Sequence, residues 1–322
     1  MKFFYDFYDE LKKVFENCQE IISNYPEGLS DTGKKYLSRY NVFEENASKN
    51  YICYLLSFWV NHECGVKKDI CIKITVANTF MMLFAFIQDD LIDREIELKD
   101  MPEMISLGNL FFLEFMSIYR EIFESHKKIW DYYDFYMKRW SKSITDEQKN
   151  INNEISLLEE EMVSIVSSKA ELVKIAVTGI CVLSKKEKLL NIYSKAVDKI
   201  LFSLQIADDY IDWEKDLKKS NTNILLREFM KKEGIKYSMD IKASDVKEEI
   251  IFGTIVDKLC TVLRENSYNL NLMIEDKNIY IKEYNNSILG FMEDQRRKCL
   301  EKKRKIEMGG FSNWVDKNIF NI

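Results

Sequence analysis

The segment Ile74-Thr-Val-Ala-Asn-Thr-Phe-Met-Met-Leu-Phe-Ala-Phe-Ile-Gln88 runs directly into Asp89-Asp90-Leu91-Ile92-Asp93. It is apolar on nearly every side of a helix, which predicts a helix buried almost all round. Residues three and four positions apart share a helical face, so one stripe continues from the apolar part into the acidic part. That stripe consists of Met82, Phe86, Asp89 and Asp93. The change along it predicts a pocket wall with acidic groups at its mouth.

A second segment repeats this pattern. Ile200-Leu-Phe-Ser-Leu-Gln-Ile-Ala207 leads into Asp208-Asp209-Tyr-Ile-Asp212, and Asp216 follows one turn later. Here the stripe consists of Leu201, Leu204, Asp208 and Asp212. With 31% charged residues in the chain, a single acidic cluster is most simply a solvated face. Two clusters that each end an apolar run favour a functional site instead.

Paired carboxylates on a helical face need a cation to offset their repulsion. They are hard oxygen ligands, and Mg²⁺ is typically held by one or two carboxylates together with substrate phosphates. The two clusters, Asp89 to Asp93 and Asp208 to Asp216, therefore predict a diphosphate site between two helices.

The chain has 322 residues with only 2 Pro and 10 Gly. Few turn residues and no alternating strand pattern predict an all-α protein. No linker separates the two acidic helices, so we expect one antiparallel helix bundle over residues 1–322 with an active-site cavity in its core. The expected helices are 3–24, 42–62, 69–95, 106–125, 128–143, 146–182, 187–218, 222–233, 243–267 and 270–305.

Several other classes of protein are disfavoured. The 7 Cys lack C-x-x-C spacing, which fits reduced thiols in a cytoplasmic protein. The chain has neither a nucleotide-binding glycine loop nor a nucleic-acid module, and its net charge is −6. No signal peptide is visible, and the apolar run before Asp89 is shorter than the roughly 20 residues that span a bilayer. We therefore expect a cytoplasmic protein without stable membrane insertion or nucleic-acid partners.

With these residues in view, the pair of motifs resembles the superfamily of trans-isoprenyl diphosphate synthases and class I terpene synthases. Asp89-Asp90-x-x-Asp93 matches its D-D-x-x-D motif, and Gln205-Ile-Ala-Asp208-Asp209 is similar to the second aspartate motif of the synthases. Asp208, Asp212 and Asp216 also have the spacing of the cyclases' metal-binding triad.

This resemblance implies a Mg²⁺-dependent enzyme that acts on a prenyl diphosphate, with three ions bridging to the diphosphate. It implies catalytic roles for Asp89, Asp90, Asp93, Asp208 and Asp212, and metal ligation by these residues together with Asp209 and Asp216. The substrate-binding residues that it implies are Lys169, Lys174, Gly179, Arg297, Met82, Phe86 and Leu204. Gly179 would lie at a helix break facing the cavity. A homodimer is a further expectation, since dimers are common in the superfamily.

Departures from the synthase pattern decide the reading within the superfamily. No Arg pair follows Asp93, and Gly33-Lys-Lys-Tyr-Leu-Ser-Arg39 is similar to the synthases' N-terminal basic element but lies far from Asp89 in sequence. One convincing basic cluster predicts one diphosphate, hence a terpene cyclase acting on farnesyl or geranylgeranyl diphosphate. The alternative is a prenyltransferase that joins an allylic diphosphate to isopentenyl diphosphate or another acceptor. A third, non-enzymatic alternative is the regulatory subunit of a heteromeric synthase.

Overall fold

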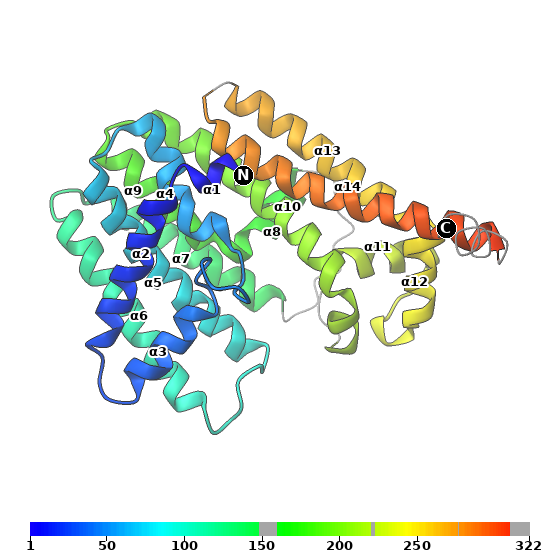
Figure 1. The fold of residues 1–322 in the computed structure, drawn as a ribbon, viewed down its shortest axis with the longest axis horizontal. Helices are drawn as coiled ribbons and strands as arrows, with labels where there is room; N and C mark the ends of the chain where they lie inside the picture. The colour runs from blue at the N-terminus through cyan, green and yellow to red at the C-terminus, as the bar shows by residue number, and fades with distance from the viewer. Residues whose placement is uncertain (148–159, 220–222, 276, 310–322) are drawn as a thin grey trace, which may run out of the picture. The chain divides into compact units, whose positions relative to one another are not determined.

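All regular structure is helical in the part of the chain that the computed structural model describes, residues 1–147, 160–219, 223–275 and 277–309 (Figure 1). The all-α prediction is therefore confirmed. The α-helices are α1 (Lys2–Tyr5), α2 (Tyr8–Ser23), α3 (Leu29–Ser38), α4 (Tyr51–Cys64), α5 (Lys68–Ile92), α6 (Met101–Ile122), α7 (Lys128–Glu147), α8 (Glu160–Ser167), α9 (Lys174–Leu183), α10 (Glu187–Lys219), α11 (Ile224–Glu233), α12 (Ala243–Phe252), α13 (Ile255–Ile274) and α14 (Ile279–Glu307). Two 3₁₀ helices are η1 (Ser168–Val173) and η2 (Ser238–Asp240).

The chain divides into two compact units. The first unit contains 1–143, 168–197 and 274–283, and the second contains 144–167, 198–273 and 284–322. The first aspartate cluster lies in the first unit and the second cluster in the second unit. The single-domain prediction for 1–322 stays a prediction.

Helix α5 is the central element of the first unit. It packs against α2, α4, α6 and α9, which surround it in Figure 1. Its middle is buried, with Ile74, Phe80 and Leu83 all at 0% exposure, as its apolar sequence predicts. Burial of this kind fixes the axis of α5, and so it fixes where the aspartates at its end are presented.

Helix α5 is also long and apolar enough to cross a membrane by length and composition, which corrects the expectation that its apolar run is too short. However, 78% of its most apolar window is buried inside the protein. That burial is typical of the core helix of a soluble protein, because a membrane helix needs its apolar surface for lipid. Cytoplasmic location stays a prediction.

In the second unit, α13 and α14 form an antiparallel pair (Figure 1), and α13 contacts the middle of α10. Arg264 on α13 pairs with Glu293 on α14 at 2.6 Å. Asn266 of α13 donates hydrogen bonds to the Lys199 carbonyl at 2.7 Å and to the Ser203 hydroxyl at 2.9 Å. The buried Asn266 hydrogen bonds fix the part of α10 that precedes the second aspartate cluster.

Helix α3 was not expected from the sequence, because its polar residues and Gly33 are typical of a loop. It forms because Gly28 begins it at φ +85 and Gly33 lets it approach two neighbours closely. A Cβ on Gly33 would lie 2.8 Å from Ile22 of α2 and 3.2 Å from Leu107 of α6. Tertiary packing rather than intrinsic propensity makes this helix.

Four predicted helices are divided. The helix expected over 3–24 becomes α1 and α2, and the helix expected over 270–305 covers the end of α13 and most of α14. The helix expected over 146–182 includes residues outside the described ranges, and its later part becomes α8, η1 and α9, with non-helical backbone at Ala170. The helix expected over 243–267 is interrupted at Gly253. There the Glu249 carboxylate accepts hydrogen bonds from the backbone amides of Thr254 and Ile255, at 2.9 and 3.1 Å. A Cβ at Gly253 would overlap that carboxylate, so the break depends on glycine.

Candidate active site

The first aspartate cluster lies at the carboxyl end of α5. Asp89 and Asp93 are exposed and Asp90 is half-buried. Backbone hydrogen bonds from Asp93 to Asp89 and from Glu95 to Asp90, both 2.9 Å, close the helix end. A helix carries partial negative charge at its carboxyl end, and the last turn of α5 contains no basic residue. The negative charge of these carboxylates is therefore unfavourable at this end of α5, and a bound cation would offset it.

Asp90 is held by two residues that the predicted site did not include. Its Oδ2 accepts hydrogen bonds from the Tyr36 hydroxyl at 3.0 Å and from Arg39 Nη1 at 3.2 Å. Tyr36 is on α3 and Arg39 caps its end. Burial acts to lower the pKa of Arg39, but the neighbouring Tyr40 and Asp90 raise it above its ordinary value. Only Gly33-Lys-Lys-Tyr-Leu-Ser-Arg39 hinted at this neighbour, and its sequence distance from Asp89 concealed the contact.

Aromatic rings line the same end of α5. Phe86 stacks on Tyr40, with ring centroids 4.5 Å apart and an interplanar angle of 22°. The Arg39 guanidinium lies 4.9 Å from the Tyr36 ring centroid and 5.5 Å from that of Tyr40. Such contacts restrain the arginine through the electron-rich ring faces. Met82, one turn earlier, is 5% exposed and belongs to the core beneath this group.

In the second cluster, Asp208 and Asp212 are exposed on α10, and Leu204 is half-buried one turn before Asp208. Desolvation by the surrounding protein, together with the charges of Asp209 and Asp212, raises the pKa of Asp208 to about 6. Like charges that disfavour ionisation in this way are relieved by a divalent cation. Asp208 and Asp212 are thus the members of this cluster that can reach a metal ion in solvent.

Asp209 and Asp216 are engaged within the second unit. Asp209 is 5% exposed, and its two carboxylate oxygens accept hydrogen bonds from Gln205 Nε2 at 2.7 Å and from the Ile224 amide at 2.6 Å. Asn223 Nδ2 donates to the Asp209 carbonyl at 2.9 Å and to Asp216 Oδ2 at 2.7 Å. These bonds join the start of α11 to α10. Metal ligation by Asp209 and Asp216 stays a prediction.

The two predicted lysines differ in their surroundings. Lys169 is half-buried on η1, whereas Lys174, the first residue of α9, is 3% exposed. The Lys174 ammonium lies 2.9 Å from Glu171 Oε1, and Arg139 Nε lies 3.6 Å from Glu171 Oε2. Glu171 itself is fully buried. Their contact with a diphosphate stays a prediction.

Gly179 does not lie at a helix break. It is buried inside α9, which is helical from Lys174 to Leu183, and the irregular backbone lies earlier, at Ala170. A Cβ at Gly179 would approach Phe123 Cζ to 3.1 Å and the Tyr119 hydroxyl to 3.3 Å. Close packing of α9 against the end of α6 explains the glycine.

Arg297 is on α14 in the second unit. Its side chain is 70% exposed and pairs with Asp294, which also holds Lys298 at 2.7 Å. These pairs lower the pKa of Asp294, with the Lys298 hydrogen bond as the largest cause. The arginine is therefore on a solvated helix face within its unit, and its contact with substrate stays a prediction.

The available donor side chains limit which metal ion the site could hold. No group of three or more His, Cys, Asp or Glu side chains within the described ranges could form a metal cage. The candidate metal ligands are therefore two pairs of exposed aspartates, Asp89 with Asp93 and Asp208 with Asp212. This set fits Mg²⁺, which keeps several waters and takes phosphate oxygens to complete its octahedron.

The raised pKa of Asp208, caused first by desolvation and then by the charges of Asp209 and Asp212, predicts the direction of a change in stability. Asp208→Asn should raise the free energy of unfolding of the metal-free protein by about 1 kcal/mol, since the raised pKa means that ionised Asp208 opposes folding at neutral pH and exposure to water screens most of the cost. Urea unfolding at pH 7 with a chelator measures it. Asp240→Asn, at an exposed aspartate of η2, is the control. A lower stability of Asp208→Asn would contradict the electrostatic account.

Several solved structures have a fold similar to that of this chain. The chain is similar to a geranylgeranyl pyrophosphate synthetase from the archaeon Geoglobus acetivorans, with a TM-score of 0.67 at 16% identity over 91% of this chain and 98% of that one. It is similar to an octaprenyl pyrophosphate synthase from Helicobacter pylori, with a TM-score of 0.65 at 14% identity over 87% and 98%. A geranyltranstransferase from Thermotoga maritima gives 0.59 at 16% identity over 90% and 100%.

No family model and no curated protein matches the sequence. The structural likeness establishes the fold, which is that of the trans-isoprenyl diphosphate synthases, and so confirms the resemblance that the two aspartate motifs predicted.

Proposed function

We propose that this chain is a prenyltransferase that joins an allylic prenyl diphosphate to isopentenyl diphosphate. The observation that carries the proposal is a pair of exposed aspartates that follows an apolar helical segment in each unit, Asp89 with Asp93 and Asp208 with Asp212, on the fold of the prenyl diphosphate synthases. The similar structures are named for prenyl transfer, which favours the alternative drawn from the sequence over terpene cyclisation.

The exposed aspartates would hold Mg²⁺. When bound, Mg²⁺ would neutralise the charge that develops on the leaving diphosphate. The chain's own part is to hold these carboxylates on rigid helices where solvent reaches them. Asp90 would contribute differently from Asp89 and Asp93, because Tyr36 and Arg39 already occupy its Oδ2.

Arg39 favours transfer over cyclisation. The cyclase reading depended on finding a single basic cluster, and the fold brings Arg39 to the first aspartate motif, where sequence distance had hidden it. Its side chain is 52% exposed, so a guanidinium edge remains open to an anion beside the aspartates. Guanidinium groups bind phosphate oxygens well. Arg39 therefore supplies a cation for a second diphosphate.

The apolar and aromatic residues at the end of α5 would exclude water from the reaction. In the proposed step the allylic C–O bond breaks, the double bond of isopentenyl diphosphate attacks the allylic carbon, and one proton leaves. Phe86 and Tyr40 present stacked rings there, and ring faces stabilise a transient cation. Rapid capture by a bound acceptor is needed because water would quench the cation.

The test is product analysis by mass spectrometry after incubation of the purified chain with Mg²⁺ and geranyl, farnesyl or geranylgeranyl diphosphate, with and without isopentenyl diphosphate. We expect a longer diphosphate only when isopentenyl diphosphate is present. A hydrocarbon or alcohol formed without the acceptor would establish the cyclase reading instead. No turnover alone, with activity restored by a partner chain, would establish a regulatory subunit.

Arg39 gives a prediction for this assay. Arg39→Gln should raise the KM for isopentenyl diphosphate about tenfold, since a hydrogen bond to a charged group contributes roughly 1.5–3 kcal/mol, while the KM for the allylic substrate changes less. Initial rates with each substrate varied in turn measure the two constants. Lys12→Ala, at an exposed lysine of α2, is the control. Equal changes in both constants would contradict a role for Arg39 in acceptor binding.

A further inference from the structure

The last part of α14, in the second unit, has a charge opposite to that of the whole chain. Residues 296–305 contain seven Lys or Arg and one Glu, whereas the net charge of the chain is −6. Cations in the last turn of a helix stabilise it through the macrodipole, but this effect falls off beyond that turn. It accounts for Arg304 and Lys305, which are in the last turn, and not for the basic residues before them.

Two of these cations fasten α14 to neighbouring helices. Arg296 Nε pairs with Asp257 of α13, and the Lys303 ammonium donates to the Phe252 carbonyl of α12 at 3.2 Å. Residues seven positions apart, as Arg296 and Lys303 are, lie on the same side of a helix. That side of α14 therefore serves the packing of the second unit.

The other five cations are exposed, and we call them the basic face. They are Arg297, Lys298, Lys302, Arg304 and Lys305. Arg297 and Lys298 share one partner, Asp294, and their side chains are 70% and 61% exposed. The remaining three pair with no acidic side chain in the part of the chain that the structure describes.

Charge repulsion on the basic face is left without compensation inside the protein. Lys298 and Lys302 are one turn apart, and like charges at this spacing destabilise a helix. A solvated face is the simplest use of a charge run, but such a face usually mixes both signs, and here one sign prevails. An anionic partner would offset the repulsion.

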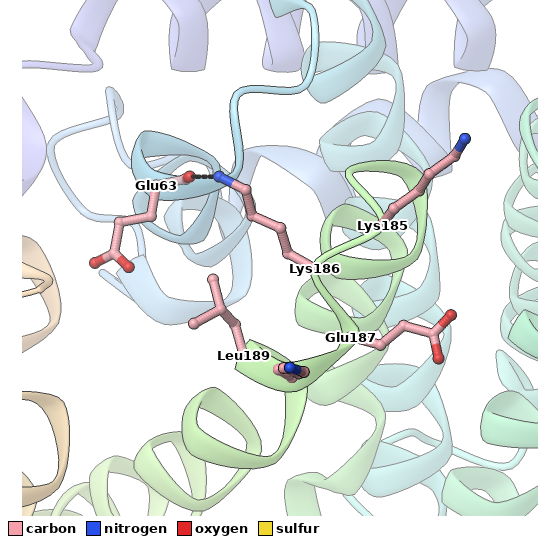
Figure 2. Close-up of a pocket in the computed structure, with 6 residues that line it drawn as sticks. Glu63, Lys185, Lys186, Glu187 and Leu189 are labelled. Carbon is pink, nitrogen blue, oxygen red and sulfur yellow. Dashed lines mark hydrogen bonds between the residues drawn. The ribbon is translucent and has the colours of Figure 1, made fainter.

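Basic residues in the first unit are arranged differently. Several surround a pocket of about 570 Å³, but acidic residues lie among them. Figure 2 shows Lys186 extended toward the Glu63 backbone, whose carbonyl accepts its hydrogen bond, and Lys185 directed away from it. Lys128 pairs with Glu187 at the same pocket, at 3.1 Å. These cations serve separate partners and form no continuous positive surface.

Apolar side chains are exposed beside the basic face. Leu300 is 38%, Ile306 50% and Met308 63% exposed. Leu300, Arg304 and Met308 follow one another at four-residue spacing, so they form one stripe along the helix. Basic residues with exposed apolar neighbours are typical of helices that lie on a membrane, where the apolar groups enter the headgroup region. Binding to nucleic acid would give these apolar side chains no role.

We propose that the basic face binds the surface of an anionic lipid bilayer, with Ile306 and Met308 entering the headgroup region. Each Lys or Arg near such a surface strengthens binding about fivefold. The rest of the chain is acidic and is repelled by the same surface, which orients the molecule with α14 toward the lipid. The contact is peripheral, because a helix with so many charges lies on a bilayer and does not span it.

Binding to lipid does not depend on the prenyltransferase activity, but its use does. A prenyl diphosphate combines a charged head with a hydrocarbon tail, so an elongated product is most favourably placed in a bilayer. A synthase held at the membrane surface releases its product where the tail can be buried. This use of the basic face rests on the proposed function.

The experiment is flotation of the purified full chain with vesicles of phosphatidylcholine, either alone or with about one-third phosphatidylserine. We expect binding to the phosphatidylserine vesicles only, and loss of that binding as the NaCl concentration rises, since salt screens the attraction. Equal binding to both kinds of vesicle, binding that salt leaves unchanged, or no binding to either would overturn the proposal.

A triple variant assigns the binding to the basic face. Lys298→Ala, Lys302→Ala and Lys305→Ala together should weaken partition onto the phosphatidylserine vesicles about 100-fold, at roughly fivefold for each residue. Arg297 is kept, because it belongs to the predicted substrate site. The three lysines are exposed, so circular dichroism and turnover of the variant should match the wild type.

A matched control removes the same charge from exposed lysines elsewhere in the second unit. It combines Lys231→Ala, Lys236→Ala and Lys242→Ala. This variant should bind the vesicles within about threefold of the wild type, since its lysines lie outside the basic face. Equal losses in the two triple variants would show that net charge alone governs binding, and would overturn the assignment to α14.

A further variant separates a lipid surface from a site for any polyanion. Ile306→Ser with Met308→Ser keeps every charge, so it should weaken vesicle binding about tenfold through the lost apolar contact and leave binding to a short DNA duplex unchanged. Unchanged vesicle binding, or a wild-type chain that binds the duplex and not the vesicles, would overturn the proposal. Flotation does not measure turnover, so this proposal and the prenyltransferase proposal fail separately.

Discussion

Asp89→Ala is expected to lower turnover by at least about 10²–10³-fold, the loss typical of removing one group that stabilises developing charge. Asp89 is exposed at the end of α5, so the substitution creates no cavity. Removing a carboxylate from the negative end of a helix is also favourable for the fold. The variant should therefore unfold at the same denaturant concentration as the wild type, or slightly above it.

Steady-state rates at saturating Mg²⁺ and substrate measure this loss, and far-ultraviolet circular dichroism checks the fold. Asp69→Ala is the matched control, because Asp69 is exposed in the first turn of the same helix. It should retain full activity. A folded Asp89→Ala protein with normal turnover would remove the first motif from the proposed mechanism.

Glu171→Gln is expected to destabilise the protein by about 3–5 kcal/mol, the cost of breaking a buried ion pair by removing one of its two charges. Glu171 is fully buried, and Lys174 beside it is 3% exposed. Arg139, which also pairs with Glu171, is 34% exposed and can turn toward water. Urea unfolding measures the loss. Glu121→Gln, which breaks an exposed pair with Lys73, should change stability by less than about 1 kcal/mol.

A double variant separates the structural role of Lys174 from its predicted contact with the diphosphate. Glu171→Leu with Lys174→Met replaces both charges by apolar groups, which is often neutral or stabilising for a buried pair, so most of the stability should return. If Lys174 binds the diphosphate, this folded protein is inactive. If it turns over normally, Lys174 serves the fold alone.

The fold was predictable because it depends on long apolar periodicities. The helix through Asp89 and the helix through Asp208 were placed within a few residues of their observed bounds, since each contains a continuous apolar segment that leads into its aspartate cluster. Helix α3 was missed because a close approach to α2 and α6, through Gly33, decides it. The break at Gly253 was missed for a similar reason, since the Glu249 carboxylate that fills the space there belongs to a preceding turn.

The site could be predicted where its residues lie on one helix. Contacts between residues on different helices could not be predicted. The spacing of Asp89 and Asp93 is readable along α5. The contact of Asp90 with Tyr36 and Arg39 joins residues 54 and 51 positions apart, and no local pattern encodes it. Likewise, only the fold reveals that Asn223 and Ile224 bind Asp209, because these contacts connect separate helices.

The contacts of the first aspartate motif depend on residue 33 remaining a glycine. The residue touches no functional group, yet any side chain there would press on Ile22 and Leu107 and move α3 outward. Tyr36 lies on α3 and Arg39 caps its end. A shift of α3 by about an ångström would therefore break their hydrogen bonds to Asp90. In a mutational library selected for activity, position 33 should therefore resist substitution as strongly as the aspartates do. Position 33 would then tolerate as few substitutions as a catalytic residue, although Gly33 takes no part in catalysis.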